Sequence, residues 1–242
     1  MRRSMAGIGL IELMVAMTLG LVITLGVTQI FLTAKNTYRS QSAAAAIQED
    51  ARFILSKMIQ EVRSVGMFGC LATVQDSSKE GDFAAAFATP ITVTRSSNGN
   101  VVLTLVYADV GENGPLPTWQ IRSDCKFSAT AYTGGQAPAL AAGQLTFPIR
   151  RVVYSYSSNS INVGPKADSV SPLINNVSQF DVTFGMASND ADEFASSYVA
   201  TPTNFALIRS VRIALKVTDG NATALAREQS FSVVASIRNR LL

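Results

Sequence analysis

The first part of the chain is an uncharged apolar run of membrane-spanning length. No charged residue occurs from Leu13 to Ala34. As a helix these 22 residues would extend about 33 Å, enough to cross the hydrocarbon core of a bilayer. Arg2 and Arg3 precede the run and Lys35 follows it, which predicts a cytoplasmic N-terminus with the rest of the chain translocated. A cleaved secretory signal has a shorter run and a small-x-small site, so a plain signal anchor is the simplest alternative.

The apolar pattern continues past Lys35 at helical spacing, and no proline occurs before Pro90. The apolar positions recur every three or four residues, at Ile47, Ala51, Ile54, Met58, Val62 and Val65, as on one face of an amphipathic helix. Lys57 and Glu61 lie off this stripe and four positions apart, a spacing that favours an ion pair. The pattern predicts one helix from residue 8 to about 65, whose second half packs on a globular domain. Gly66 and Gly69 would end it.

The remainder of the chain has the pattern of β-strands. Runs that alternate or are rich in β-branched residues lie at 91–95, 101–107, 144–149, 151–157, 178–186, 209–217 and 229–237. A long N-terminal helix followed by such runs predicts an α+β fold, with the helix packed on an antiparallel β-sheet domain. Residues 186–206 are rich in Ser, Asn and Asp, and we expect an exposed or mobile loop there.

Composition narrows the functional classes. The chain has 242 residues, a net charge of +3 and no histidine. This charge is too small to indicate nucleic-acid binding, and the lack of histidine removes the commonest general base and transition-metal ligand. The sequence also lacks a nucleophile elbow and a P-loop. We therefore expect no enzyme activity, no catalytic residues and no cofactor.

One acidic cluster raises the question of a metal site. Asp190, Asp192 and Glu193 lie close together in the loop region, and hard cations such as calcium take oxygen ligands from acidic loops. The cluster lacks the twelve-residue EF-hand pattern. A solvated acidic loop is the preferred interpretation, and no metal site is predicted.

Glu12 is unusual because it stands at the start of the apolar run, in the stretch "GIGLIEL" at 7–13. A carboxylate inside a spanning segment costs roughly 2.5–3.5 kcal/mol at the bilayer centre and less near its edge. Either the side chain reaches the headgroups, or a cation from another chain neutralises it after the segment leaves the lipid.

The stretch around Glu12 resembles the type IV prepilin signature, with its short basic leader, a glycine before the cleavage site and a glutamate at the fifth position of the mature chain. The resemblance implies that residues 1–7 are a leader, that a prepilin peptidase cuts between Gly7 and Ile8, and that Ile8 is N-methylated. It also implies that Glu12 neutralises the N-terminal amine of a neighbouring subunit. Ile8 replaces the usual Phe, and Gly9 a common Ser or Thr. Residues 8–34 would then be the transmembrane and assembly helix, 35–66 its amphipathic continuation and 67–242 a periplasmic β-rich domain.

Weaker likenesses are spread over the rest of the chain. The segments "RSVGMFGC" (63–70), "PLINNVSQFDVTFG" (172–185), "IRSVRIALKV" (208–217) and "RNRLL" (238–242) resemble the PilW group of minor pilins, which is related to J-type minor pseudopilins. This resemblance implies a minor pilin that primes type IV pilus assembly or sits at the pilus tip. Its partners would be other minor pilins, the major pilin, the prepilin peptidase and the inner-membrane assembly platform. The alternatives are a pseudopilin of type II secretion and a tip adhesin or DNA-uptake pilin.

The two cysteines, Cys70 and Cys125, allow two interpretations. A domain exported to an oxidising compartment is expected to pair them. The alternative is two free buried thiols. Two cysteines without histidine do not make a convincing zinc site.

Overall fold

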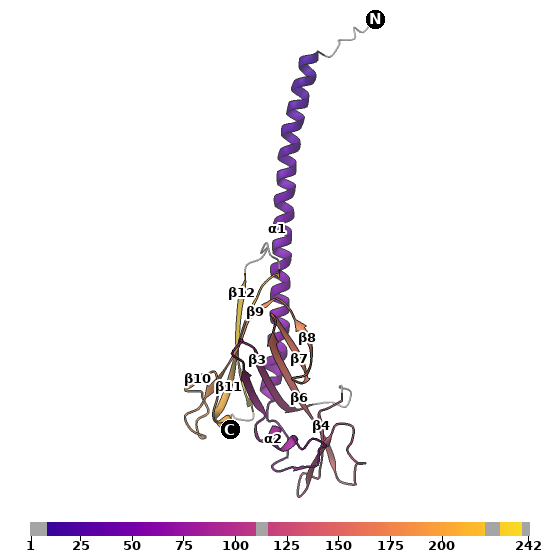
Figure 1. Cartoon of the computed structure of the whole chain (residues 1–242), viewed down its shortest axis with the longest axis vertical. Coiled ribbons are helices and arrows are strands. Elements are labelled where there is room, and N and C mark those ends of the chain that lie inside the picture. The colour runs from indigo at the N-terminus through magenta and orange to yellow at the C-terminus, as the bar shows by residue number, and fades with distance from the viewer. Residues whose placement is uncertain (1–8, 110–115, 221–227, 239–242) are drawn as a thin grey trace.

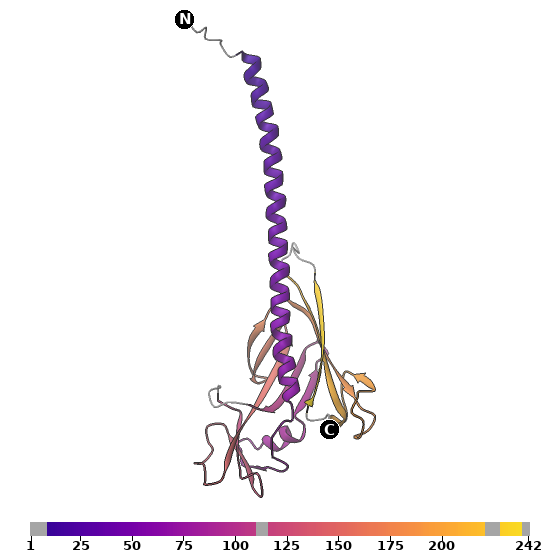
Figure 2. The ribbon, with the colours of Figure 1, turned by 180° about the vertical axis from the view of Figure 1, so that it is seen from behind.

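The computed structural model of this chain describes residues 9–109, 116–220 and 228–238. One helix, α1 (Leu10–Ser64), is 55 residues long. Its N-terminal half projects away from the rest of the molecule, while its C-terminal half lies among the strands (Figures 1 and 2). The expected single long helix is therefore present, and residue 8, where it was expected to begin, lies outside the described residues.

The apolar stripe explains why the second half of α1 is embedded. The six stripe residues, from Ile47 to Val65, are each at most 3% exposed. Past its end the chain turns at Gly66, where φ is +70°, a conformation that glycine adopts without steric cost. The Gly66 N–H donates to the Val106 carbonyl at 3.1 Å. This bond fixes the end of the helix to the neighbouring strand β3 (Val101–Ala108).

The strands of the β-rich domain form two sheets. The larger sheet has the order β1-β5-β4-β6-β3-β2, with β7 paired to β6 and β8 paired to β7. Its strands are β1 (Gln75–Asp76), β2 (Ile91–Arg95), β3 (Val101–Ala108), β4 (Trp119–Ser123), β5 (Ala129–Thr133), β6 (Leu145–Ser157), β7 (Ser160–Lys166) and β8 (Ser169–Ile174). All its pairs are antiparallel except the short parallel pair of β1 and β5. A short helix, α2 (Phe83–Ala88), precedes β2.

The smaller sheet is entirely antiparallel, in the order β10-β9-β11-β12. Its strands are β9 (Val177–Met186), β10 (Ser197–Val199), β11 (Ile208–Val217) and β12 (Gln229–Ser236). A 3₁₀ turn at Phe205–Leu207 precedes β11. Side chains of both sheets and of α1 form one large hydrophobic core. A smaller cluster around Trp119 and Phe83 lies beyond the end of α1. The fold class is α+β, as expected.

Two expected strands, 144–149 and 151–157, are in fact one strand of 13 residues, β6. Pro148 lies within this strand, although proline cannot donate to a ladder. Its carbonyl accepts from the Asp109 N–H at 2.8 Å, just past the end of β3 at Ala108. The position that lacks an N–H therefore faces the place where the neighbouring strand has ended. No ladder hydrogen bond is lost, and the strand continues.

Candidate functional site

The free half of α1 is the most unusual surface of the molecule. Its large apolar side chains from Leu10 to Leu32 are each 46–79% exposed. Within the part of the chain that the structure describes, α1 is the one helix long and apolar enough to cross a membrane, and the rest of the chain buries none of its most apolar window. Water does not tolerate so much exposed apolar surface. This half is compatible with a location in lipid or among other apolar helices.

The threonine hydroxyls on α1 are satisfied within the helix. Each donates to a main-chain carbonyl three or four residues earlier, at 2.7–3.0 Å, and the set comprises Thr18, Thr24, Thr28, Thr33 and Thr37. Unpaired polar groups are costly in hydrocarbon. The internal bonds remove that cost, so the threonines do not oppose a location in lipid.

Glu12 lies in the first turn of α1. Its Oε2 atom accepts from the Gly9 backbone N–H at 3.4 Å, the reciprocal half of a capping arrangement. A carboxylate there also lies favourably at the positive end of the helix dipole. Among the described residues, no cationic side chain forms an ion pair with Glu12. Gly7 and Ile8, the expected processing site, lie outside the described residues.

The junction between α1 and the larger sheet contains a buried polar group, Glu61, which is 6% exposed. Tyr154 of β6 donates its phenolic hydrogen to Glu61 Oε2 at 2.6 Å, and the Lys57 ammonium lies 2.6 Å from Oε1. Burial, and then the negative charge of Glu61, raise the pKa values of Tyr154 and Tyr107 well above the usual range for tyrosine. Both phenols therefore stay protonated, and the junction is fixed by a satisfied polar cluster.

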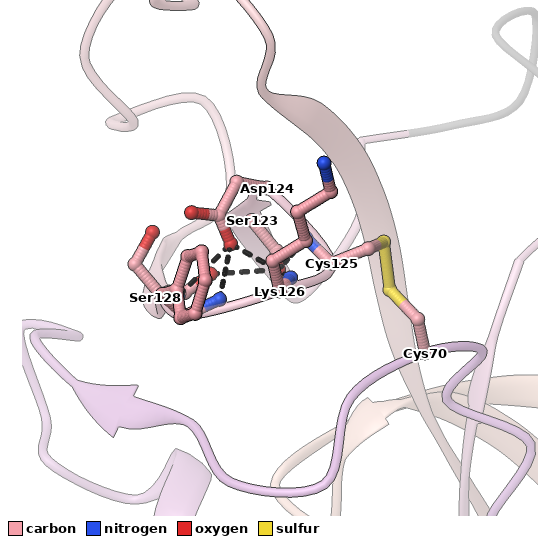
Figure 3. Close-up of a disulfide and its surroundings, with 7 residues drawn as sticks. Cys70, Ser123, Asp124, Cys125, Lys126 and Ser128 are labelled. Carbon is pink, nitrogen blue, oxygen red and sulfur yellow. Dashed lines mark hydrogen bonds between the residues drawn. A yellow bond between two sulfur atoms is a disulfide. The ribbon is translucent and has the colours of Figure 1, made fainter.

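The structure contains the expected disulfide between Cys70 and Cys125, whose Cα atoms are 5.5 Å apart. It joins the segment after α1 to the turn between β4 and β5 (Figure 3). In that turn Asp124 Oδ1 accepts three backbone N–H groups, each at 2.9 Å, from Lys126, Phe127 and Ser128. These hydrogen bonds hold the pKa of the Asp124 carboxyl well below its usual range.

The acidic loop is ordered by a cation of the protein itself. Arg209, which is 5% exposed, donates to the backbone carbonyls of Asp190 and Asp192 at 3.0 and 2.7 Å. It also donates to the carbonyls of Asn189 and Ala206. Within the described residues, no group of three or more carboxylate, cysteine or histidine side chains could hold a metal ion. The segment 186–206, expected to be an exposed or mobile loop, is largely exposed. It also includes strand β10 and wraps around Arg209.

Sequence reasoning found Glu12, the cysteines and the Lys57–Glu61 pair, but it missed the partners of Glu61 and Arg209. Glu61 lies off the apolar stripe, so the periodic pattern did not predict its burial. Tyr154 is 93 positions away in the sequence, so no local pattern joins the two. The signal for Arg209 was its place at the start of an apolar strand, where an unpaired cation would be costly.

Comparison with known proteins does not assign a family. No protein-family model matches the chain, and no curated protein matches it. A functional assignment therefore depends on the residues and geometry described above.

Proposed function

We propose that this protein is a minor subunit of a type IV pilus, anchored through α1 in the bacterial inner membrane and then incorporated into the fibre, at or near its tip. The observation that carries the proposal is the free half of α1. It combines complete exposure of an apolar surface with one acidic side chain in the first turn. A plain membrane anchor needs the apolar surface, and Glu12 would serve it only as a cap of the first helical turn.

The assembly function follows from the two environments that such a helix can occupy. Lipid covers it before assembly, and a bundle of similar helices covers it afterwards, since water cannot. In the bundle, an unmatched carboxylate would be penalised, whereas one that meets a cationic group of a neighbour would not. Glu12 would then select the register in which the subunit enters. The neighbour's N-terminal amine, freed and methylated after cleavage between Gly7 and Ile8, is the proposed cation.

The domain suits a subunit exposed to the periplasm and then to the cell exterior. Its disulfide is of a kind that persists in oxidising compartments. The Glu61–Tyr154 cluster and the buried stripe hold the domain on the helix. Insertion of the helix into a fibre would therefore carry the domain with it. The proposed partners are other minor pilins, the major pilin, the prepilin peptidase and the assembly platform.

The experiment is replacement of Glu12 in the source cells at native expression level. Glu12→Ala leaves the neighbour's amine without its partner inside the bundle, and breaking a buried pair in this way costs about 3–5 kcal/mol. We expect at least about tenfold less protein in sheared surface fibres, with unchanged membrane levels and unchanged leader cleavage. Asp50→Ala, which removes an exposed acid from the same helix, is the matched control. Equal incorporation of both variants would refute the register function.

A further inference from the structure

Strand β12 has one edge that no described strand covers. It pairs with β11 along its whole length without a register shift, and no other described strand pairs with it. The Ile237 N–H donates to the Arg209 carbonyl at 2.9 Å. Because alternate residues of an antiparallel strand direct their backbone groups toward the partner, this bond shows which residues of β12 face β11 and which face away. The residues whose backbone N–H and C=O groups point away from β11 are Ser230, Ser232, Val234 and Ser236. This edge therefore offers a row of donors and acceptors to another chain.

The other sheet edges in the described part of the chain are short or obstructed. Strand β1 has two residues and β10 has three. Strand β8 contains Pro172 and pairs irregularly. Strand β2 ends in Arg95, which reaches across to Asp181 of β9 at 2.9 Å. Proteins protect edges in these ways against unwanted pairing. Strand β12 has eight residues, with no proline and no charge, so the usual protection is missing at this edge.

A groove of about 1010 Å³ lies between β12 and α1. Phe231 and Val233 line it from the strand, and Leu55 and Ile59 line it from the helix. Phe231 and Val233 are only half-buried, although their partners on β11 are at most 1% exposed. A further strand beside β12 would complete the burial of these two side chains. Figures 1 and 2 both show β12 running alongside α1, in the same direction.

We propose that β12 accepts an extended strand of a different subunit of the fibre, which adds a fifth strand to the smaller sheet. This inference rests on the proposed assembly function. Main-chain hydrogen bonds would supply much of the affinity, as in other cases of strand addition. The charges in the groove, Glu49 and Arg52, are of opposite sign, and β12 itself is uncharged. The incoming strand is therefore expected to be uncharged and apolar on its inner face.

The direction of β12 argues against a second copy of this chain. Two copies joined antiparallel through β12 would be related by an axis perpendicular to the sheet. Because β12 and α1 run the same way, the two α1 helices would then point in opposite directions. Their apolar halves could not enter one membrane or one helix bundle. A different subunit, free of this symmetry, can present its strand with its own helix parallel to α1.

The test is hydrogen–deuterium exchange resolved to single amides, on the full chain in detergent and in fibres sheared from the source cells. We expect exchange at Ser230, Ser232, Val234 and Ser236 to slow at least about tenfold on assembly. The alternate amides, which already bond to β11, should be protected in both states. Slower amide exchange in residues 10–34 of α1 would show that the subunit has entered the fibre. Protection of α1 without protection of the β12 edge overturns this inference and leaves the proposed function standing. If the protein is absent from the fibres, this inference and the proposed function are both refuted.

A substitution provides the second arm. Ser232→Pro removes one outward N–H and no main-chain bond to β11, a change that edge strands tolerate. It also removes the side-chain hydrogen bond from Arg212 Nε to Ser232 Oγ at 3.2 Å, which lies on the exposed face. Incorporation into fibres should fall at least about tenfold, with the melting temperature of the purified protein nearly unchanged. Ser197→Pro, at the exposed first residue of edge strand β10, is the matched control and should incorporate normally. Normal incorporation of a folded Ser232→Pro variant contradicts the inference. If that variant does not fold, the exchange measurement decides.

Discussion

The Tyr154 hydroxyl donates a 2.6 Å hydrogen bond to Glu61, and this contact joins α1 to β6 across a buried interface. Lys57 approaches the other carboxylate oxygen from the helix itself. The projecting half of α1 can transmit its position to the domain only through the embedded half. The contact between Glu61 and Tyr154 is therefore the polar part of the connection between α1 and the sheets.

Tyr154→Phe should lower the free energy of unfolding by about 1–3 kcal/mol, because it leaves a buried carboxylate oxygen without its donor. The phenyl ring stays in place, so no cavity contributes. Denaturant unfolding of the full chain in detergent, followed by circular dichroism, measures the change. Tyr38→Phe alters an exposed tyrosine of α1 and should shift stability by no more than about 0.5 kcal/mol. Equal effects of the two variants would show that the hydrogen bond contributes nothing.

Asp124 makes the stability of the domain depend on pH in the acid range. Its folded-state pKa is lowered by three backbone donors, whereas the unfolded carboxyl titrates near about 3.9. The unfolded chain therefore binds the proton first, and stability from this group, present above pH 4, is lost as the pH falls toward the folded value. Between about pH 4 and pH 2, the wild-type protein should lose stability more steeply than Asp124→Asn, whose amide oxygen still accepts hydrogen bonds. If the stabilities of the two proteins fell equally with pH over this range, the prediction would be wrong.

Arg209→Leu should release the loop between β9 and β11. The guanidinium bonds four backbone carbonyls of that loop, and hydrogen bonds to a charged group contribute about 1.5–3 kcal/mol. Limited proteolysis of the folded protein should cut within residues 187–207 at least about tenfold faster in this variant. Arg212→Leu removes an exposed arginine of the same strand and should leave the cleavage rate unchanged. Equally slow cleavage of the two variants would show that Arg209 is not needed to order the loop.

The sequence predicted the elements whose burial repeats locally. The stripe from Ile47 to Val65 marked the embedded face of α1, because each member meets the core at the period of a helix. The run 91–95 matched β2 to the residue, since Pro90 and the turn residues after Arg95 bound it. The pairing of Cys70 with Cys125 was also predicted from the sequence, because an exported domain is expected to pair its two cysteines.

The sequence did not predict features that depend on distant contacts. Strands β4 and β7 alternate polar and apolar residues over only four or five positions, which is a short signal, and both are completed by pairing with β6. The division into two sheets, the burial of Glu61 and the shape of the loop around Arg209 depend on partners far away in the sequence. Only the folded chain brings these partners together.

Mass spectrometry of the N-terminus of the protein from its source cells tests the central claim most directly. The account predicts a mature chain that begins with N-methylated Ile8, because a prepilin peptidase removes residues 1–7 and leaves the amine that Glu12 of a neighbour meets. A chain that retains Met1–Gly7 in cells with an active prepilin peptidase would contradict it. The anchor would then be an ordinary one, and Glu12 would have no partner to select.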